Sequence, residues 1–145
     1  MKNLWIAAGF TAAFVAGYAA HGTFPGPSVV SAQASGRVFE LRTYTAPDGK
    51  LGDLHARFRD HTMRIFAKHG ITSIVYFKPQ DTPLSQNTLV YLIAHPSREA
   101  ATKNWDEFRK DPEWVKVSAE SQANGPIVTK VDSVFLVPTD YSPMK

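Results

Sequence analysis

The stretch RVFELRTYT, Arg37 to Thr45, alternates two kinds of side chain and is the clearest strand signal in the chain. Such alternation places successive side chains on opposite faces of a sheet. The sequence Ala-Pro-Asp-Gly at residues 46–49 follows with typical turn residues. One face would carry Phe39, Leu41 and Thr43, and the other would carry Val38, Glu40, Arg42 and Tyr44.

Residues 50–69 have the periodicity of an amphipathic helix. Its apolar face would consist of Leu51, Leu54, Phe58, Thr62, Ile65 and His69. Gly70 follows as a typical helix-ending residue. Asp53 and Asp60 each precede an arginine by four residues, which predicts the surface ion pairs Asp53–Arg57 and Asp60–Arg64.

The remaining segments complete an α+β fold. Residues 71–78 and 88–94 have strand composition, and the second of these is apolar on both faces, as in a central strand. A helix capped by Ser97 follows, then a shorter helix to about residue 123 and a last strand over 127–137. The order strand–helix–strand–strand–helix–(helix)–strand is ferredoxin-like. It predicts a four-stranded antiparallel sheet with helices on one face.

The face of the sheet without helices predicts a homodimer. We assign Val38, Glu40, Arg42 and Tyr44 to that face, together with alternate residues of the other strands. Monomers seldom expose an apolar patch larger than a few hundred Å². Pairing of two sheets would bury it.

The sequence Asp111-Pro112-Glu113-Trp114 has two interpretations. Two carboxylates beside an indole could perform acid–base chemistry on a substrate. Alternatively, Asp111 is the N-cap of the short helix, Pro112 its first residue, and Glu113 complements the positive end of the helix dipole. The capping interpretation accounts for every residue, so we expect no catalytic role here.

Together these motifs resemble the NIPSNAP family. The resemblance rests on ELRTYT (residues 40–45), Gly-Lys-Leu (49–51), Trp105 with Phe108, and DPEW (111–114). It covers nearly all of residues 37–138 and implies a dimeric α+β barrel. That group also includes small monooxygenases, haem-degrading enzymes and muconolactone isomerases, whereas NIPSNAP domains themselves have no settled activity. The resemblance therefore implies a fold rather than a reaction.

Residues 1–34 read as a signal peptide or an N-terminal anchor with a linker, ahead of a domain at 35–145. Lys2 precedes an uncharged run from Leu4 to Ala20, and Ala-Gln-Ala at 32–34 suits signal-peptidase cleavage. The apolar run is shorter than the ~20 residues of a typical spanning helix. Both interpretations predict an exported protein, periplasmic or secreted, without other membrane contact.

Composition excludes several classes of function. The chain has no cysteine, which excludes disulfides, thiolate metal sites and a cysteine nucleophile. Its formal charge is +3 and no basic cluster occurs, so we expect no nucleic-acid partner. Nucleotide-binding glycine motifs are missing from the sequence, and we expect no cofactor.

A small apolar organic ligand could lie between the sheet and the helices. Its pocket would be lined by Phe39, Phe58, Tyr76, Tyr91, Trp105 and Phe108, with Glu40, Arg42 and Tyr44 as polar contributors. His61, at the edge of the apolar helix face, is the candidate catalytic residue. The alternative is an aromatic core with a satisfied histidine. Glu40 and Arg42 could instead form ion pairs across the dimer, or Arg42 could bind a ligand carboxylate.

Histidine spacing does not predict a metal site. His55, His61 and His69 lie 6 and 8 residues apart, unlike HExxH sites, and His95 and Glu40 would be needed as further ligands. Three functions stay open: a binding or interaction module without catalysis, a cofactor-independent oxygenase- or isomerase-like enzyme, and haem or metal binding through His61, His69 or His95.

Overall fold

The computed structural model describes residues 37–145, so the predicted export segment lies outside the described residues. Within 37–145, no helix is long and apolar enough to cross a membrane. The elements, in chain order, are β1 (Val38–Thr45), α1 (Leu51–Arg57), a π-helical turn η1 (Phe58–Thr62), α2 (Met63–Lys68), β2 (Thr72–Phe77), a 3₁₀ turn η2 (Leu84–Gln86), β3 (Thr88–His95), α3 (Arg98–Lys110), α4 (Pro112–Ser121) and β4 (Lys130–Leu136).

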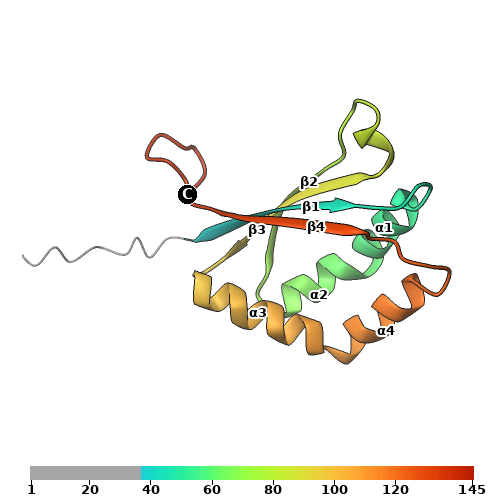
Figure 1. Ribbon diagram of the computed structural model, residues 1–145. Coiled ribbons are helices and arrows are strands. Elements are labelled where there is room, and N and C mark those ends of the chain that lie inside the picture. Colours follow the sequence, from blue (N-terminus) through green and yellow to red (C-terminus); the bar gives the residue numbers. More distant parts are fainter. Residues whose placement is uncertain (1–36) are drawn as a thin grey trace, which may run out of the picture. The chain divides into compact units, whose positions relative to one another are not determined.

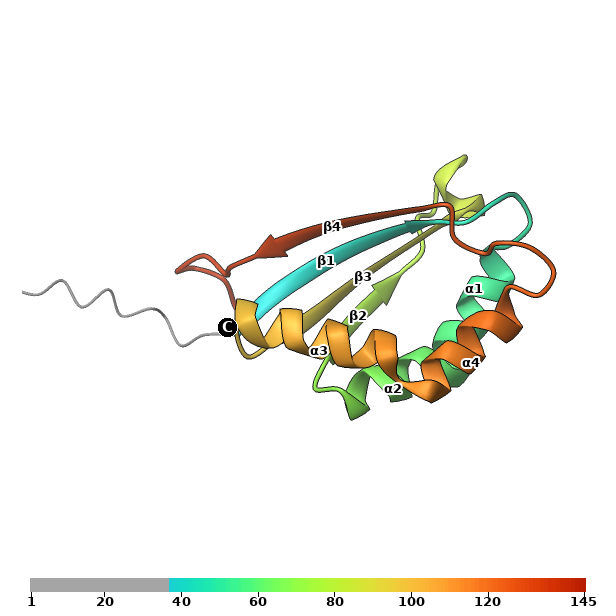
Figure 2. The same ribbon diagram turned by 60° about the horizontal axis from the view of Figure 1, so that its bottom comes forward.

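The four strands form one antiparallel sheet in the order β2-β3-β1-β4, with β3 and β1 in the centre. Figures 1 and 2 show α1, α2, α3 and α4 on one side of this sheet. The predicted α+β, ferredoxin-like architecture is therefore confirmed. The central position predicted for residues 88–94 is confirmed as well.

The prediction of which β1 side chains face away from the helices was wrong. Glu40 contacts Trp105 of α3, and Tyr44 packs against Phe58, so this set of residues faces the helices. The alternate set includes Phe39, which lies on the open face in an apolar hollow with Leu92 and residues of the C-terminal tail. Alternation shows that two faces differ. It does not show which one the helices cover, and here the polar residues are buried and the apolar ones line the open face.

The open face is nevertheless strongly apolar. Strand register places one apolar set on it, continuing from Phe39 across the sheet: Leu41, Val75, Phe77, Val90, Leu92, Val134 and Leu136. Several of these side chains, including Phe77, Val134 and Leu136, are exposed.

The predicted helix at 50–69 contains a π-helical turn at Phe58–Thr62. The predicted apolar residues Leu54, Phe58 and Ile65 are buried. A π-turn holds more residues than an α-turn and changes the phase of the side chains that follow. His61 is consequently exposed at the surface and does not reach the aromatic interior, contrary to the prediction.

Aromatic rings pack closely between the sheet and the helices. Ring centres lie 5.1 Å apart for Phe58 and Tyr91, 5.4 Å for Tyr76 and Tyr91, and 5.0 Å for Phe66 and Phe108. These spacings are typical of favourable aromatic pairs. The predicted pocket lining, apart from Phe39, is thus a contiguous cluster.

The DPEW sequence begins α4 as predicted. Asp111 accepts a hydrogen bond from the Glu113 backbone N–H at 2.8 Å, and Pro112 occupies the first turn. The Asp111 carboxylate also lies 2.6 Å from Lys68 Nζ and 2.6 Å from His69 Nε2. The cap therefore joins the start of α4 to the end of α2.

Candidate functional site: a groove with a buried arginine

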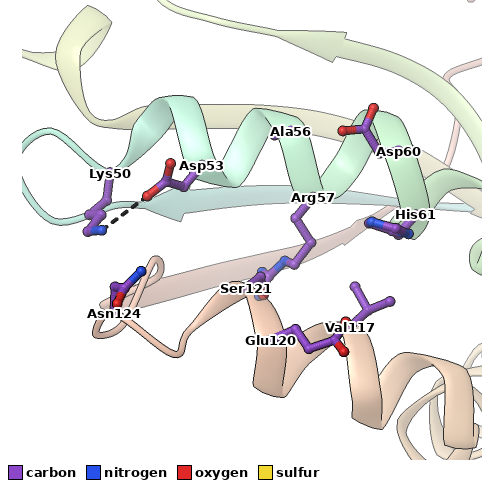
Figure 3. A pocket seen from close by; sticks show the side chains of 10 residues that line it. All are labelled: Lys50, Asp53, Ala56, Arg57, Asp60, His61, Val117, Glu120, Ser121 and Asn124. Atoms are coloured by element: carbon purple, nitrogen blue, oxygen red, sulfur yellow. Dashed lines mark hydrogen bonds and ion pairs between the residues drawn. The ribbon is translucent and has the colours of Figure 1, made fainter.

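A groove of about 370 Å³ lies between α1 with η1 on one side and α4 on the other. Figure 3 shows its side chains projecting from both helical segments. Its lining is mainly polar: Lys50, Asp53, Ala56, Arg57, Asp60, His61, Val117, Glu120, Ser121 and Asn124. This volume lies within the range of small-molecule sites.

Arg57 occupies the floor of this groove. Only 6% of the residue is exposed, and its guanidinium lies 5.2 Å from the centre of the Trp114 ring. Figure 3 shows its side chain crossing from α1 toward Ser121 of α4, whose hydroxyl accepts a hydrogen bond from Arg57 Nη1 at 3.4 Å. The side chain thus links the two walls of the groove.

Arg57 has no carboxylate partner among residues 37–145. Its Nε is buried, and no described residue hydrogen-bonds to it. Burial lowers the pKa of Arg57, and the nearby Tyr44 and Tyr91 raise it by a smaller amount. A buried cation is stable when an anion and hydrogen bonds compensate its lost hydration. Arg57 is therefore poised to bind an anion.

Tyr44, Tyr91 and Arg42 lie on the sheet side of Arg57. The Tyr44 and Tyr91 rings are 5.3 Å apart, and Arg42 Nη2 donates to the Tyr44 hydroxyl at 3.3 Å. The Tyr91 hydroxyl and Arg42 Nε are buried, with no hydrogen-bond partner among the described residues. Burial raises the pKa of Tyr91 well above its usual value, so the hydroxyl stays protonated and can donate. Three unsatisfied buried donors belong to this one cluster.

The Glu40 carboxylate makes its hydrogen bonds to other side chains of the protein. It accepts hydrogen bonds from Trp105 Nε1 at 2.7 Å, Ser133 Oγ at 2.6 Å and Arg42 Nη1 at 2.5 Å, and lies 3.1 Å from His95 Nε2. Burial alone would raise the pKa of Glu40, but these hydrogen bonds outweigh it and lower the pKa to about 2. A carboxylate held this way is a poor base. The predicted cross-dimer pairing of Glu40 and Arg42 is thus replaced by a pair within the chain.

The predicted helix-surface ion pairs do not form either. Asp53 bonds to Lys50 at 3.1 Å, and Arg64 forms a bidentate pair with Glu113. Asp60 consequently lacks a cationic partner among residues 37–145, and its exposed side chain lies at the edge of the groove and points away from α4 (Figure 3).

The structure brings some of the predicted site residues together and separates others. Arg42, Tyr44 and Tyr91 converge behind Arg57, whereas Phe39 lies on the opposite face of the sheet. His61 lines the polar groove. The prediction missed Arg57 and Ser121. Arg57 follows buried Leu54 by three residues and precedes Phe58, so helical spacing could have placed it beside the apolar face.

The histidines considered as haem or metal ligands lie in separate environments. His69 bonds to Asp111, His95 bonds to Glu40, and His61 lines the groove. Within residues 37–145, no three His, Asp or Glu side chains converge as metal ligands would. The alternative of metal binding gains no support from this arrangement.

Comparison with known proteins decides the family. The sequence matches the NIPSNAP family over residues 39–143. The chain belongs to the NIPSNAP family. The resemblance inferred from ELRTYT and DPEW is confirmed.

Solved NIPSNAP structures show the same fold. A NIPSNAP family protein of Agrobacterium tumefaciens aligns with a TM-score of 0.66 at 21% identity, covering 76% of this chain and 100% of that one. A second protein of that organism, a NIPSNAP protein of unknown function, gives 0.65 at 19% identity, covering 75% and 94%. A NIPSNAP-like domain protein of Burkholderia xenovorans gives 0.64 at 20% identity, covering 74% and 89%. No curated protein matches this chain. At these identities the likeness establishes the fold.

Proposed function

We propose that this NIPSNAP domain binds a small organic carboxylate in the groove between α1 and α4, with Arg57 holding the carboxylate. The observation that carries the proposal is a guanidinium with 6% exposure and no acidic partner among the described residues. The planar fork of arginine matches the two oxygens of a carboxylate.

The surroundings of Arg57 suit a ligand with an apolar body. Val117 and Ala56 line the groove beside it, and Trp114 lies beneath its guanidinium. A carboxylate that approaches Arg57 would leave its hydrocarbon part against these side chains. The protonated Tyr91 hydroxyl is buried on the sheet side of Arg57 and does not itself line the groove.

We further propose that the protein is a homodimer formed through the open face of the sheet. The apolar side chains that strand register places there include Leu41, Leu92 and exposed Val134. A second copy offers the same apolar face, and burial of such a surface is favourable by roughly 25 cal/mol per Å². This arrangement leaves the groove, on the helix side, open to solvent.

The sequence of residues 1–34 supports an exported location for this binding function. An uncharged run after Lys2 and the Ala-Gln-Ala sequence at 32–34 suit a signal peptide or an anchor. The ligand would then be a small molecule present outside the cytoplasm.

Proton transfer by His61 is a second candidate function. His61 lies four residues after Arg57, one helical turn along, and lines the same groove. A carboxylate held by Arg57 would bring an adjacent C–H bond near the imidazole, which could act as a base in an isomerase-like reaction. Solvent deuterium entering the activated methylene of 3-oxohexanoate faster than in buffer would support this role. An equal rate in the His61→Gln variant would contradict it.

Calorimetric titration tests the binding function. Hexanoate and phenylacetate should each bind, whereas the uncharged analogue hexanamide should not. Arg57→Gln should abolish binding, and Arg59→Gln is the matched control, because it removes the same charge from an exposed position two residues away. Failure of both carboxylates to bind, or equal binding to the Arg57→Gln variant, would refute the proposal.

A further inference from the structure

An apolar hollow of about 260 Å³ lies at one corner of the open face of the sheet. One wall of this hollow is the C-terminal tail, residues 137–145. The tail holds itself in a turn, because the Ser142 N–H donates to the Thr139 carbonyl at 3.1 Å and Lys145 Nζ donates to the same oxygen at 2.7 Å. The apolar lining comes from the sheet and the tail together: Phe39, Leu92, Leu136, Val137 and Met144.

Exposed apolar side chains lie at the opposite corner of the same face. Phe77 ends the edge strand β2, whereas the tail follows Leu136 of the other edge strand, β4, at the other end of the sheet. Phe77 is 56% exposed, and Leu84 in the β2–β3 loop, residues 78–87, is 55% exposed. Figure 1 shows this loop and the tail rising from the sheet on the side away from the helices.

The flat part of the sheet is too small for a standard dimer interface. The eight residues of β1 span about 26 Å, and four strands span about 19 Å, so the face measures roughly 500 Å². A stable interface typically takes about 800 Å² from each partner. The tail and the β2–β3 loop project from this face and are placed to supply the difference.

Two-fold symmetry can bring the two corners together. A symmetric dimer uses the same patch on both copies, so a contact between hollow and projection occurs twice. An axis that lies in the face, midway between the hollow and Phe77 and perpendicular to the line joining them, places each Phe77 over the hollow of the other copy. Phe77 lies about 13 Å from Phe39 along the strands and about 10 Å across them. The two sheets would therefore cross near a right angle, as in orthogonally packed sheets.

We propose that the two copies of the dimer interlock, with Phe77 of each copy inserted in the hollow of the other and each β2–β3 loop beside the other copy's tail. This inference rests on the proposed pairing through the open face. Phe39, Leu92 and Met144 would surround the phenyl ring with apolar atoms, and the insertion removes a large exposed aromatic side chain from water.

Introduced cysteines test the interlocking directly, because the chain has no cysteine of its own. A disulfide needs Cα atoms within about 7 Å of each other. In the double variant Phe77→Cys/Met144→Cys, the two positions of one copy lie at opposite corners, so a disulfide can form only between copies. Mild oxidation should convert this variant to a covalent dimer, whereas each single variant should stay unlinked.

Phe77→Ala tests the contribution of the inserted ring. It should raise the Kd of the dimer at least about tenfold, because aromatic side chains that fill interface pockets are typical hot spots and the dimer contains this contact twice. Val115→Ala, at a similarly exposed position of α4, is the control and should leave the Kd unchanged. Sedimentation velocity over a concentration series measures both.

The outcomes separate the interlocking from the dimer itself. If the unaltered protein dimerises but the double variant stays unlinked, or if Phe77→Ala leaves the Kd unchanged, the interlocking is wrong and pairing through the open face stands. If the unaltered protein is a monomer at micromolar concentration, the proposed dimer itself is wrong.

Discussion

Arg57 of α1 lies with its guanidinium 5.2 Å from the centre of the Trp114 ring of α4, with no carboxylate partner in the described part of the chain. A residue kept for stability alone would not need this charge, because an apolar side chain of similar length could fill the same place. The arrangement is typical of a site in which stability is given up for binding.

Replacing Arg57 by methionine should therefore leave stability within about 1 kcal/mol of the unaltered protein or increase it, since apolar replacements of buried charges are often neutral or stabilising. Carboxylate binding should be lost in the same variant. Urea unfolding followed by circular dichroism measures the first effect, and calorimetry the second. A stability loss well above 1 kcal/mol would show that the charge of Arg57 is structural.

Replacing Glu40, unlike replacing Arg57, should lower the stability of the protein. Glu40→Gln removes the charge on which Arg42 and three other donors converge, and breaking a buried pair typically costs about 3–5 kcal/mol. Glu107→Gln, at an exposed position of α3, should change stability by less than about 0.5 kcal/mol. Urea unfolding of both variants provides the comparison. A small effect of Glu40→Gln would mean that its hydrogen bonds contribute little.

The low pKa of the Glu40 carboxylate should make the free energy of unfolding depend on pH in the acid range. Its pKa falls from the usual 4.5 to about 2 in the folded protein, so its contribution is present above pH 4.5 and is lost as the pH falls toward 2. The loss amounts to about 3 kcal/mol at roughly 1.36 kcal/mol for each pH unit. Unfolding free energies measured from pH 6 to pH 2 should decline more steeply for the unaltered protein than for Glu40→Gln. Parallel curves would contradict the prediction.

The dimer proposal predicts that charge on the open face dissociates the protein. Val134, 54% exposed on that face, is the position to change, and Val115, 55% exposed on α4, is the control. Light scattering should give a dimer for the unaltered protein and Val115→Lys, and a monomer for Val134→Lys. A monomeric unaltered protein at micromolar concentration would refute sheet pairing.

Asp111 should stabilise the protein both as the N-cap of α4 and through its contacts with Lys68 and His69 at the end of α2. Asp111→Asn keeps an N-cap acceptor but loses the charge that faces Lys68 and His69, whereas Asp111→Ala loses both. The melting temperature should fall for Asp111→Asn and fall further for Asp111→Ala. Carboxylate binding should persist in both variants, because Asp111 does not line the groove. Loss of binding in Asp111→Asn would instead favour the interpretation of Asp111 and Glu113 as a functional site.

Sequence periodicity was sufficient for the fold because its signals are local. Alternation in residues 37–45, the cap at Asp111 and the glycine after α2 each depend on neighbouring residues, and each was confirmed. The family followed from the same motifs.

Side-chain orientation in three dimensions was less predictable. Glu40 can be buried on the face of the sheet that the helices cover because Trp105, Ser133 and Arg42 donate hydrogen bonds to its carboxylate. Trp105 and Ser133 belong to other elements, so their approach could not be read from the β1 sequence. His61 moved outward because a π-turn interrupts the α-helical phase. Arg57 resembled a surface residue with an acid four positions before it. Arg57 is buried because α4 packs Trp114 and Ser121 against it.

The most direct test of the binding site is an NMR titration that observes the arginine Nε–H signals during addition of phenylacetate. We predict that the Arg57 signal shifts saturably, because its buried Nε gains a hydrogen-bond acceptor, while the signal of exposed Arg59 stays in place. An Arg57 signal that does not move while phenylacetate binds elsewhere, or a complete absence of binding, would contradict it.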